Sequence, residues 1–202
     1  MQESLARRSN RERSEETRKK LMEAARRLFV EKTYAETGTP EIVAAAGVTR
    51  GALYHHFADK QALFRAVVER EAAQVAEVIE RETEEEASPI EALIKGGETF
   101  LAAMATPGRT RLLLLDGPAV LGRQVMDDID GRNGNRTLKE GLAAAMQAGA
   151  LRELPLDPLT HLLGAAYDRA ALAAEAGADA AALRVTLAAL LQGLAAPPAP
   201  RP

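Results

Sequence analysis

Apolar residues recur along this chain at the three- and four-residue spacing of amphipathic helices. The first such stripe predicts a helix from about Ser14 to Lys32. No segment alternates between apolar and polar residues as a half-buried strand does, and no internal repeat is visible. We therefore predict an all-α fold. The residues of the first stripe are Leu21, Ala24, Ala25 and Leu28.

Capping residues, prolines and glycines mark the ends of further helices. Thr39 before Pro40 is expected to cap a short helix that Gly47 ends in a left-handed conformation. Thr49 and Asp59 are expected to cap the next two helices. About nine helices are expected, over residues 14–32, 39–46, 50–57, 60–85, 89–105, 107–117, 122–148, 157–176 and 179–194, with weak points at Gly131 and Gly134.

Composition divides the chain into four segments. Residues 1–13 are polar and arginine-rich, which predicts a disordered basic arm that is either solvated or in contact with nucleic acid. Residues 197–202 are proline-rich and predict a disordered tail. Between them we expect an N-terminal domain over residues 14–58 and a larger helical domain over residues 59–196.

Several classes of protein are excluded by what the sequence lacks. The 202 residues include no Cys, which excludes a disulfide framework, a Cys-ligated metal site and a Cys nucleophile. No apolar run approaches the ~20 residues of a membrane span. The charged N-terminus has no apolar core of a secretory signal. No phosphate loop, serine-hydrolase motif or E-x-x-H pair occurs. We expect a cytoplasmic protein that is not an enzyme and needs no metal or cofactor.

Charge is distributed unevenly. Residues 1–60 carry 12 basic and 9 acidic side chains, whereas residues 61–202 carry 14 basic and 20 acidic ones. The overall net charge of −3 therefore combines a mildly basic N-terminal part with an acidic remainder. A basic surface suggests a polyanionic partner.

Residues 39–57 have the pattern of a helix-turn-helix, because two short helices flank a turn that contains Gly47. In this motif the second helix enters the major groove of DNA. Apolar residues such as Ile42 and Leu53 would fix the angle between the helices. Arg50, Ala52 and His55 would then lie on the free face of the second helix.

The segment GVTRGALYHHFADK, residues 47–60, resembles the recognition signature of the TetR family of regulators, G-V-[ST]-x-G-x-L-Y-x-H-F-x-x-K. All nine fixed positions match, and the resemblance covers about residues 14–64. Two positions depart from the pattern. Thr33 stands where the family has a glycine that ends the first helix, and Gly38 stands where it has a Ser or Thr cap. The matching residues are Gly47, Val48, Thr49, Gly51, Leu53, Tyr54, His56, Phe57 and Lys60.

The resemblance implies a three-helix DNA-binding domain followed by a helical ligand-binding and dimerisation domain. It implies a repressor that binds a pseudo-palindromic double-stranded DNA operator as a homodimer and is released by a small apolar or amphipathic effector. Two alternatives stay open: an activator of the same family, and a helical ligand-binding protein without a DNA function. No membrane partner is expected.

Residue roles at the DNA follow from side-chain chemistry together with the resemblance. Arg50 is the first candidate base reader, with a phosphate clamp as its alternative, because a guanidinium can pair bidentately with guanine. His55 and Ala52 are the next candidates. Contacts to phosphates or close to the backbone are expected from Thr39, Thr49, Gly51, Tyr54, His56 and Lys60.

The C-terminal domain offers two sets of candidate residues, each of which has plain core packing as its alternative. Effector-pocket candidates are Leu93, Phe100, Met104, Leu112, Leu115, Met126, Leu142, Met146, His161 and Tyr167. The two last helices carry leucine and alanine stripes that would pair across a two-fold axis. The dimer candidates are Leu159, Leu162, Ala166, Ala170, Leu183, Leu187, Leu190 and Leu194.

Overall fold

The computed structural model describes residues 2–196, with side chains from residue 10 onward, so the predicted tail at 197–202 lies outside the described residues. Within residues 2–196 the fold is all-α, as predicted, and contains no β-strand. The elements are α1 (Gln2–Glu31), α2 (Thr39–Ala46), α3 (Arg50–His56), α4 (Lys60–Thr83), α5 (Pro89–Met104), α6 (Arg109–Arg111), the π-helix η1 (Leu112–Asp116), α7 (Gly117–Leu121), α8 (Arg123–Gly131), α9 (Gly134–Gln147), α10 (Leu156–Glu175) and α11 (Ala180–Gln192).

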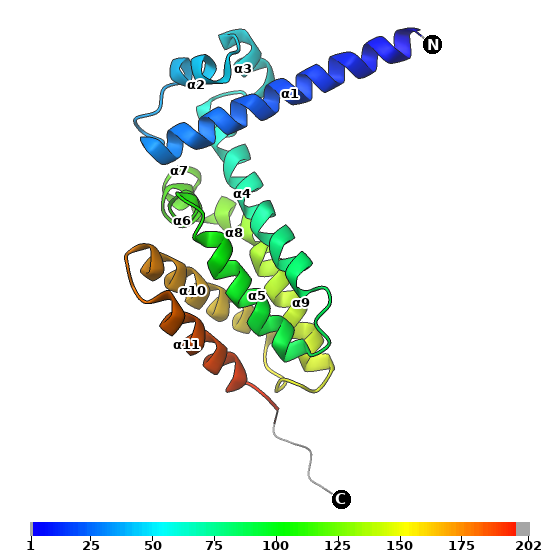
Figure 1. Cartoon of the computed structure of the whole chain (residues 1–202), viewed down its shortest axis with the longest axis vertical. Helices are drawn as coiled ribbons and strands as arrows, with labels where there is room; N and C mark the ends of the chain where they lie inside the picture. The colour runs from blue at the N-terminus through cyan, green and yellow to red at the C-terminus, as the bar shows by residue number, and fades with distance from the viewer. Residues whose placement is uncertain (1, 197–202) are drawn as a thin grey trace, which may run out of the picture.

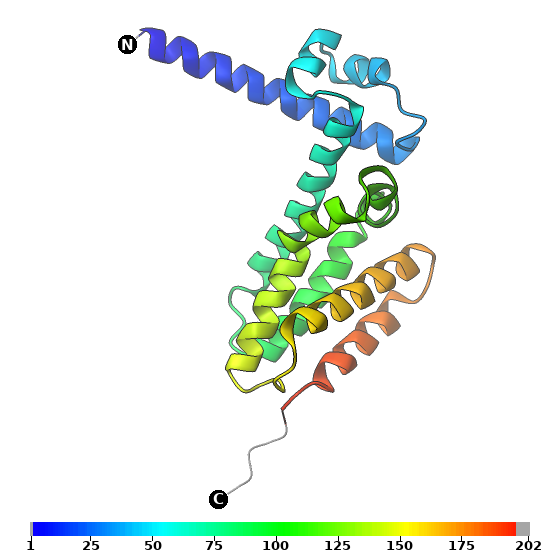
Figure 2. The ribbon, with the colours of Figure 1, turned by 180° about the vertical axis from the view of Figure 1, so that it is seen from behind.

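Figure 1 shows a head formed by α1, α2 and α3 above a bundle formed by α5 and α8 to α11. Helix α4 belongs to both parts, because its first turns pack against α1 and the rest of it runs along α5 and α9. From behind, α10 and α11 form an antiparallel hairpin at one edge of the bundle (Figure 2). No helix within residues 2–196 is long and apolar enough to cross a membrane.

The first helix starts at Gln2, so the prediction of a disordered arm is wrong for residues 2–13. The segment contains no Gly or Pro and is rich in Arg and Glu, which have high helix propensity. Ion pairs one turn apart also support the helix, because Arg11 contacts Glu15 at 2.9 Å and Lys20 contacts Glu16 at 2.7 Å. The helix that carries the head is therefore continuous with the basic arm.

Side-chain caps start α3 and α4 as predicted. Thr49 accepts a hydrogen bond from Ala52 N at 3.1 Å, and Asp59 accepts one from Ala62 N at 2.7 Å. Thr39 is not a cap, because it is the first residue of α2 and Gly38 occupies the N-cap position without a side-chain bond. Gly47 is left-handed, with φ of 65°, as expected.

The segment between residues 106 and 148 is more divided than predicted. Residues 109–121 form one helical run in which η1 replaces a turn of α-helix. Pro118 does not end this run, because it lies in the first turn of α7, where its missing N–H is tolerated. The predicted helix 122–148 breaks into α8 and α9 between the two glycines marked as weak points. With 109–121 counted as one helix, residues 2–196 hold ten helices rather than nine.

One continuous core joins the head to the upper bundle. Phe29, Tyr34 and Phe64 form an aromatic cluster, with the Phe29 and Phe64 ring centroids 5.2 Å apart and edge to face. Leucines and valines of α4 extend this core to Met104 and Ile129. The lower bundle has its own core around Leu142 of α9. The position of the head on the bundle is therefore set by packing along α4.

A buried charged cluster ties the head to the bundle at the same place. Glu71 of α4 is 1% exposed and accepts hydrogen bonds from Arg26 of α1 and Arg109 of α6, with Nε–O distances of 2.8 and 2.9 Å. Arg109 also donates to the Ala103 carbonyl at the end of α5. Burial by itself raises the pKa of Glu71, but the two guanidinium groups outweigh it and lower that pKa.

Candidate nucleic-acid interface and internal cavity

Helix α3 presents the predicted recognition residues on its solvent face. Thr49, Arg50, Gly51, Tyr54 and His55 are exposed. Ala52 and His56 are half-buried, and Leu53 and Phe57 are buried against the head. This division follows from the helical spacing, because residues 53 and 57 lie one turn apart on the inner face. The exposed face of the short helix α3 carries one cation, Arg50, at its start. Such a helix is suited to insertion into the major groove of DNA.

Tyr54 connects the two helices of the motif on the outer face. The nearby side chains of Thr39 and Arg50 lower the pKa of Tyr54. The Arg50 guanidinium carbon also lies 5.5 Å from the centre of the Tyr54 ring. Arg50 is therefore held over Tyr54 and is pre-oriented on the exposed face. Thr39 enters the interface through Tyr54, although it does not cap α2.

The two adjacent histidines differ in environment. Burial is the main cause that lowers the pKa of His56, and the charges of His55 and Arg18 add to it. A neutral His56 ring can still donate one N–H to a phosphate. Arg18 of α1 lies over the Phe57 ring at 5.1 Å, so α1 places a further exposed cation beside the end of α3. The sequence reasoning did not select Arg18, because nothing in its local pattern separates it from the other basic residues of α1.

Lys60 makes stabilising contacts within the head that the sequence did not indicate. Its ammonium donates to the carbonyls of Tyr34 and Thr37 at 2.9 and 3.0 Å and lies 4.2 Å from the centre of the Tyr34 ring. These contacts fix the connection between α1 and α2. Only its third N–H is left for a phosphate, so the predicted DNA contact of Lys60 stays a prediction.

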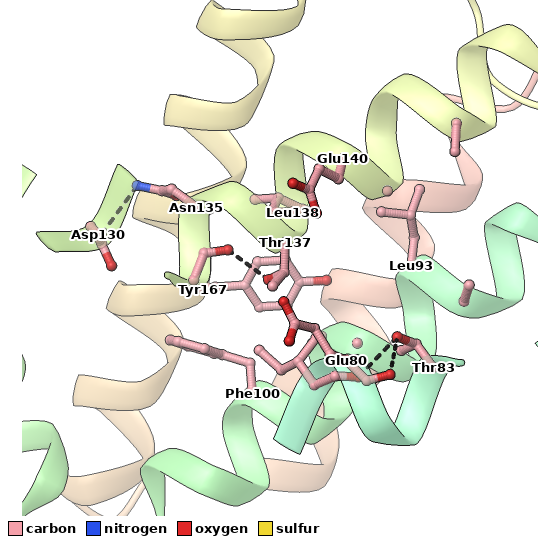
Figure 3. A pocket seen from close by; sticks show the side chains of 18 of the residues that line it. Glu80, Thr83, Leu93, Phe100, Asp130, Asn135, Thr137, Leu138, Glu140 and Tyr167 are labelled. Carbon is pink, nitrogen blue, oxygen red and sulfur yellow. Dashed lines mark hydrogen bonds between the residues drawn. The ribbon is translucent and has the colours of Figure 1, made fainter. Parts of the chain in front are cut away.

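A cavity of about 320 Å³ lies in the bundle between α4, α5, α9 and α10. Figure 3 shows Tyr167 and Phe100 at its centre, with Leu93 and Leu138 on the walls and Glu80 and Glu140 on facing helices. The Phe100 and Tyr167 rings meet edge to face with centroids 5.9 Å apart. Its volume is at the lower end of the ~300–1,000 Å³ typical of ligand sites.

Two carboxyl groups of the cavity are half-buried and have no countercharge. Asp130 of α8 accepts a hydrogen bond from Asn135 Nδ2 at 3.1 Å, and Asp168 of α10 has no hydrogen bond or ion pair with residues 10–196, whose side chains the structure describes. Burial raises the pKa of Asp130 to about 6, with a contribution from the charge of Asp127. Burial and the nearby charge of Asp130 raise the pKa of Asp168 to about 7.

The predicted pocket residues are only partly brought together. Phe100, Tyr167 and Leu93 line the cavity. Met104 and Met126 line a neighbouring cavity of about 340 Å³, which shares Phe100, Asp130 and Asp168 with the first. The remaining candidates line neither cavity, because Leu112, Leu142 and Met146 pack in the cores, Leu115 is exposed, and His161 lies in an outer groove bonded to the Asp157 carbonyl.

Sequence reasoning missed the acidic side of the cavity. Asp130 precedes a helix break and Asp168 follows Tyr167, so both read as solvated positions. The available signal was that Asp168 and Arg169 interrupt the apolar and small-residue stretch of residues 162–174. Asn135 was missed because, like Asp130, it lies next to the helix break and reads as a solvated position.

The predicted dimer residues also divide into two groups. Leu162 and Leu190 are 71% and 53% exposed on α10 and α11, together with Val185 at 70%. Ala170 and Leu187 are buried within the chain next to Tyr167 and are not free to form an interface. Leu159 and Leu194 pack partly on the lower core, and Ala166 and Leu183 pack on the cluster around Tyr167. Helical spacing alone cannot show which partner covers a face.

Comparison with known families matches both parts of the chain. Residues 21–67 match the family described as bacterial regulatory proteins, tetR family. Residues 90–196 match the tetracyclin repressor-like C-terminal domain.

Curated relatives match part of the chain. The HTH-type transcriptional regulator AcrR of Shigella flexneri is 34% identical over 111 residues, which are 54% of this chain and 51% of AcrR. The HTH-type transcriptional repressor AcnR of Corynebacterium glutamicum is 41% identical over 63 residues, which are 31% of this chain and 34% of AcnR. The chain thus spans between a third and a half of the length of these relatives. Both are named as regulators rather than enzymes.

Solved structures match over nearly the whole chain. A TetR-family transcriptional regulator from Pectobacterium atrosepticum has a TM-score of 0.75 and 30% identity, covering 94% of this chain and 99% of that one. FadR from Bacillus subtilis, in complex with stearoyl-CoA, has a TM-score of 0.74 at 20% identity, covering 85% and 96%, and shows the fold alone. From the match to both of its domains and the full-length likeness at 30% identity, this chain belongs to the tetR family of bacterial regulatory proteins.

Proposed function

We propose that this protein is a repressor that binds a pseudo-palindromic DNA operator as a homodimer and is released by a small molecule bound in the α4–α5–α9–α10 cavity. The observation that carries this proposal is the exposed face of α3, on which Arg50 is oriented by Tyr54. In this proposal residues 14–58 supply the DNA-binding part and residues 59–196 supply the ligand and dimer part. The protein would act in the cytoplasm, where its operator is.

Dimerisation is supported by the exposed apolar side chains of the α10–α11 hairpin. Leu162, Val185 and Leu190 are each more than half exposed in the single chain. Large apolar side chains this exposed on one helical hairpin are typical of an interface. Two recognition helices about one DNA turn apart, ~34–36 Å, would then read two half-sites.

The route from cavity to head is supported by the position of α5. Phe100 and Met104 of α5 line the cavities, and the carbonyl of Ala103 accepts a hydrogen bond from Arg109. Arg109 in turn binds Glu71, which binds Arg26 of α1. A ligand that displaces the end of α5 would therefore act on the cluster that holds α1. The spacing of the two heads would shift away from successive grooves.

The test of DNA recognition is selection from a random duplex library at near-physiological salt, followed by the Arg50→Ala variant. We expect a pseudo-palindrome with half-sites about one turn apart. Arg50→Ala should weaken operator binding by about 1–3 kcal/mol and relax the preference at one base pair per half-site. Arg81→Ala, with the same charge change on an exposed site at the far end of α4, is the matched control. An Arg50→Ala variant with an unchanged preference profile would make Arg50 a phosphate contact only.

The dimer is tested by sedimentation equilibrium of Leu162→Glu and Leu190→Glu. Both variants should be monomeric where the parent chain is a dimer, because a buried charge in an apolar interface is costly. Leu154→Glu, at a partly exposed loop position, is the control and should stay dimeric. A parent chain that is monomeric at micromolar concentration would refute the two-fold arrangement.

A further inference from the structure

The lining of the α4–α5–α9–α10 cavity contains four carboxylates and no Lys, Arg or His. Two of the carboxylates, Glu80 and Glu140, pair with Arg136 at the edge of the cavity. The other two, Asp130 and Asp168, have no ion pair among the side chains of residues 10–196. The negative charge inside the cavity therefore has no partner in the chain itself.

A second observation concerns the hydroxyl of Tyr167. The Tyr167 side chain is 7% exposed, and its hydroxyl makes no hydrogen bond within the described part of the chain. The hydroxyl oxygen is not fully enclosed by protein, so it can be reached from the cavity that Tyr167 lines. Figure 3 shows the Tyr167 ring lying across the cavity next to Phe100. An occupant would thus meet two aromatic rings and a free phenolic group as well as the carboxylates.

We propose that this cavity binds an amphipathic organic cation, whose ammonium group lies against Asp130 and Asp168 and whose apolar body contacts Phe100, Tyr167 and Leu93. This inference rests on the proposed function, since it names the chemical class of the effector. It goes beyond that proposal, because neither the fold nor the two-domain arrangement fixes the charge of the ligand.

The free-energy cost of removing a carboxylate from water favours a cationic ligand over an anionic or a neutral one. A carboxylate removed from water is destabilised unless a positive charge or hydrogen bonds replace the water. An anionic ligand would add to this repulsion, and a neutral one would leave it uncompensated. Aromatic faces also attract ammonium groups. A metal ion fits less well, since no group of three His, Asp or Glu side chains within residues 10–196 is arranged to hold one.

The affinity of the cavity for a cation should depend on pH. In the unliganded protein, Asp130 and Asp168 bind protons at pH values where free carboxyl groups do not, because burial raises both pKa values. A cation that needs them ionised must displace those protons. Its affinity should therefore rise from pH 5 to pH 8. The other charged groups near this pair are Asp127 and Arg123 of α8, Arg169 of α10, Glu80 of α4, Glu98 of α5, and Arg136 and Glu140 of α9.

The experiment compares three ligands that share one apolar body. Isothermal titration calorimetry of the full chain with 4-phenylbutyltrimethylammonium, 4-phenylbutanol and 4-phenylbutanoate separates charge from hydrophobic burial. The quaternary ammonium keeps its charge at every pH. We expect it to bind at least about tenfold more tightly than the alcohol at pH 8, with the carboxylate weakest. Equal affinities, or tighter binding of the alcohol or the carboxylate, would overturn the proposal.

Two isosteric variants locate the effect. Asp168→Asn and Asp130→Asn should each weaken ammonium binding about tenfold or more and leave alcohol binding within about threefold. Both remove a buried charge, so folding is expected to be retained and is checked by circular dichroism. Asp128→Asn makes the same charge change at an exposed position of α8 and should leave all affinities unchanged. Ammonium binding that is unaffected in both cavity variants would overturn the assignment of this site.

DNA binding is measured separately, so that the two proposals fail in different ways. Ammonium binding that follows this pattern but leaves operator affinity unchanged would support the ligand class and refute ligand-driven release. Alcohol or carboxylate binding that releases DNA would support the proposed function and refute the cationic effector.

Discussion

Gly97 of α5 lies against the hydroxyl of Tyr167 of α10, so closely that a Cβ atom at Gly97 would be 2.2 Å from the phenolic oxygen. The same Cβ would be 2.6 Å from two carbons of the ring. Tyr167 is buried and held by Phe100, so it has little freedom to retreat. The glycine therefore lets the aromatic ring lie across the cavity at the contact between α5 and α10.

Gly97→Ala is expected to destabilise the protein by about 1–2 kcal/mol, because overpacking costs ~1–3 kcal/mol and the higher helix propensity of Ala returns up to ~1 kcal/mol. Gly96→Ala is a matched control in the same helix, since its Cβ would lie 3.6 Å from its nearest neighbours. That variant should gain stability. Denaturant unfolding of both proteins checks the opposite signs, and a stabilised Gly97→Ala would contradict the close contact.

Thr33→Gly should raise stability by about 1 kcal/mol. Thr33 has φ of 118°, a region that a β-branched residue adopts only under strain. The substitution relieves this strain but loses the hydrogen bond that Thr33 Oγ1 accepts from Glu36 N at 3.2 Å. Thr33→Val, which keeps the branching and loses the hydroxyl, should be less stable than the parent. Thermal unfolding of the two variants measures the difference, and a less stable Thr33→Gly would mean the hydroxyl bond dominates.

Glu71→Gln should lower the free energy of unfolding by about 3–5 kcal/mol, because it leaves the buried guanidinium of Arg109 without its countercharge. Glu77→Gln, at an exposed position of α4, is the control and should change little. The pKa of Glu71 is lowered in the folded state, so its contribution is present above its ordinary value of 4.5 and is lost as the pH falls through the folded value. The difference between Glu71→Gln and the parent should accordingly shrink in acid.

Asp168→Asn should stabilise the unliganded protein at pH 8 by at least ~1 kcal/mol. The pKa of Asp168 is raised to about 7, so the folded state holds its proton more tightly than the unfolded state does. Stability from this group is complete below pH 3.8 and is lost as the pH rises to about 7. Urea unfolding at pH 5 and pH 8 should therefore show a smaller advantage of the variant at pH 5. An equal advantage at both pH values would mean that Asp168 titrates normally.

Lys60→Met should destabilise the head by about 1–3 kcal/mol, because two carbonyl groups and the Tyr34 ring lose their shared cation. If the third N–H contacts a phosphate, the slope of log affinity against log salt should also flatten by roughly one. Lys139→Met, an exposed site in the bundle, controls for charge. A loss of stability with an unchanged slope would restrict Lys60 to the structural task.

Local rules were sufficient to predict most of the head from the sequence. Thr49 and Asp59 cap their helices and Gly47 turns the chain, because each effect depends only on a few neighbouring residues. The outward face of α3 follows from the spacing of Leu53 and Phe57. The family resemblance was carried by this same short segment.

Contacts between distant segments decided the rest. Lys60 reaches carbonyls more than twenty residues away, and the carboxyl groups of Asp130 and Asp168 line the same cavities only once the bundle is assembled. Helical spacing marked Leu187 and Leu190 as one stripe, whereas the packing of α11 buries the first and exposes the second. The sequence by itself determined the all-α fold, the ends of several helices and which face of α3 is exposed. Only the tertiary structure decided what each remaining face covers and where burial leaves a charge without a partner, because both depend on neighbours that no local pattern specifies.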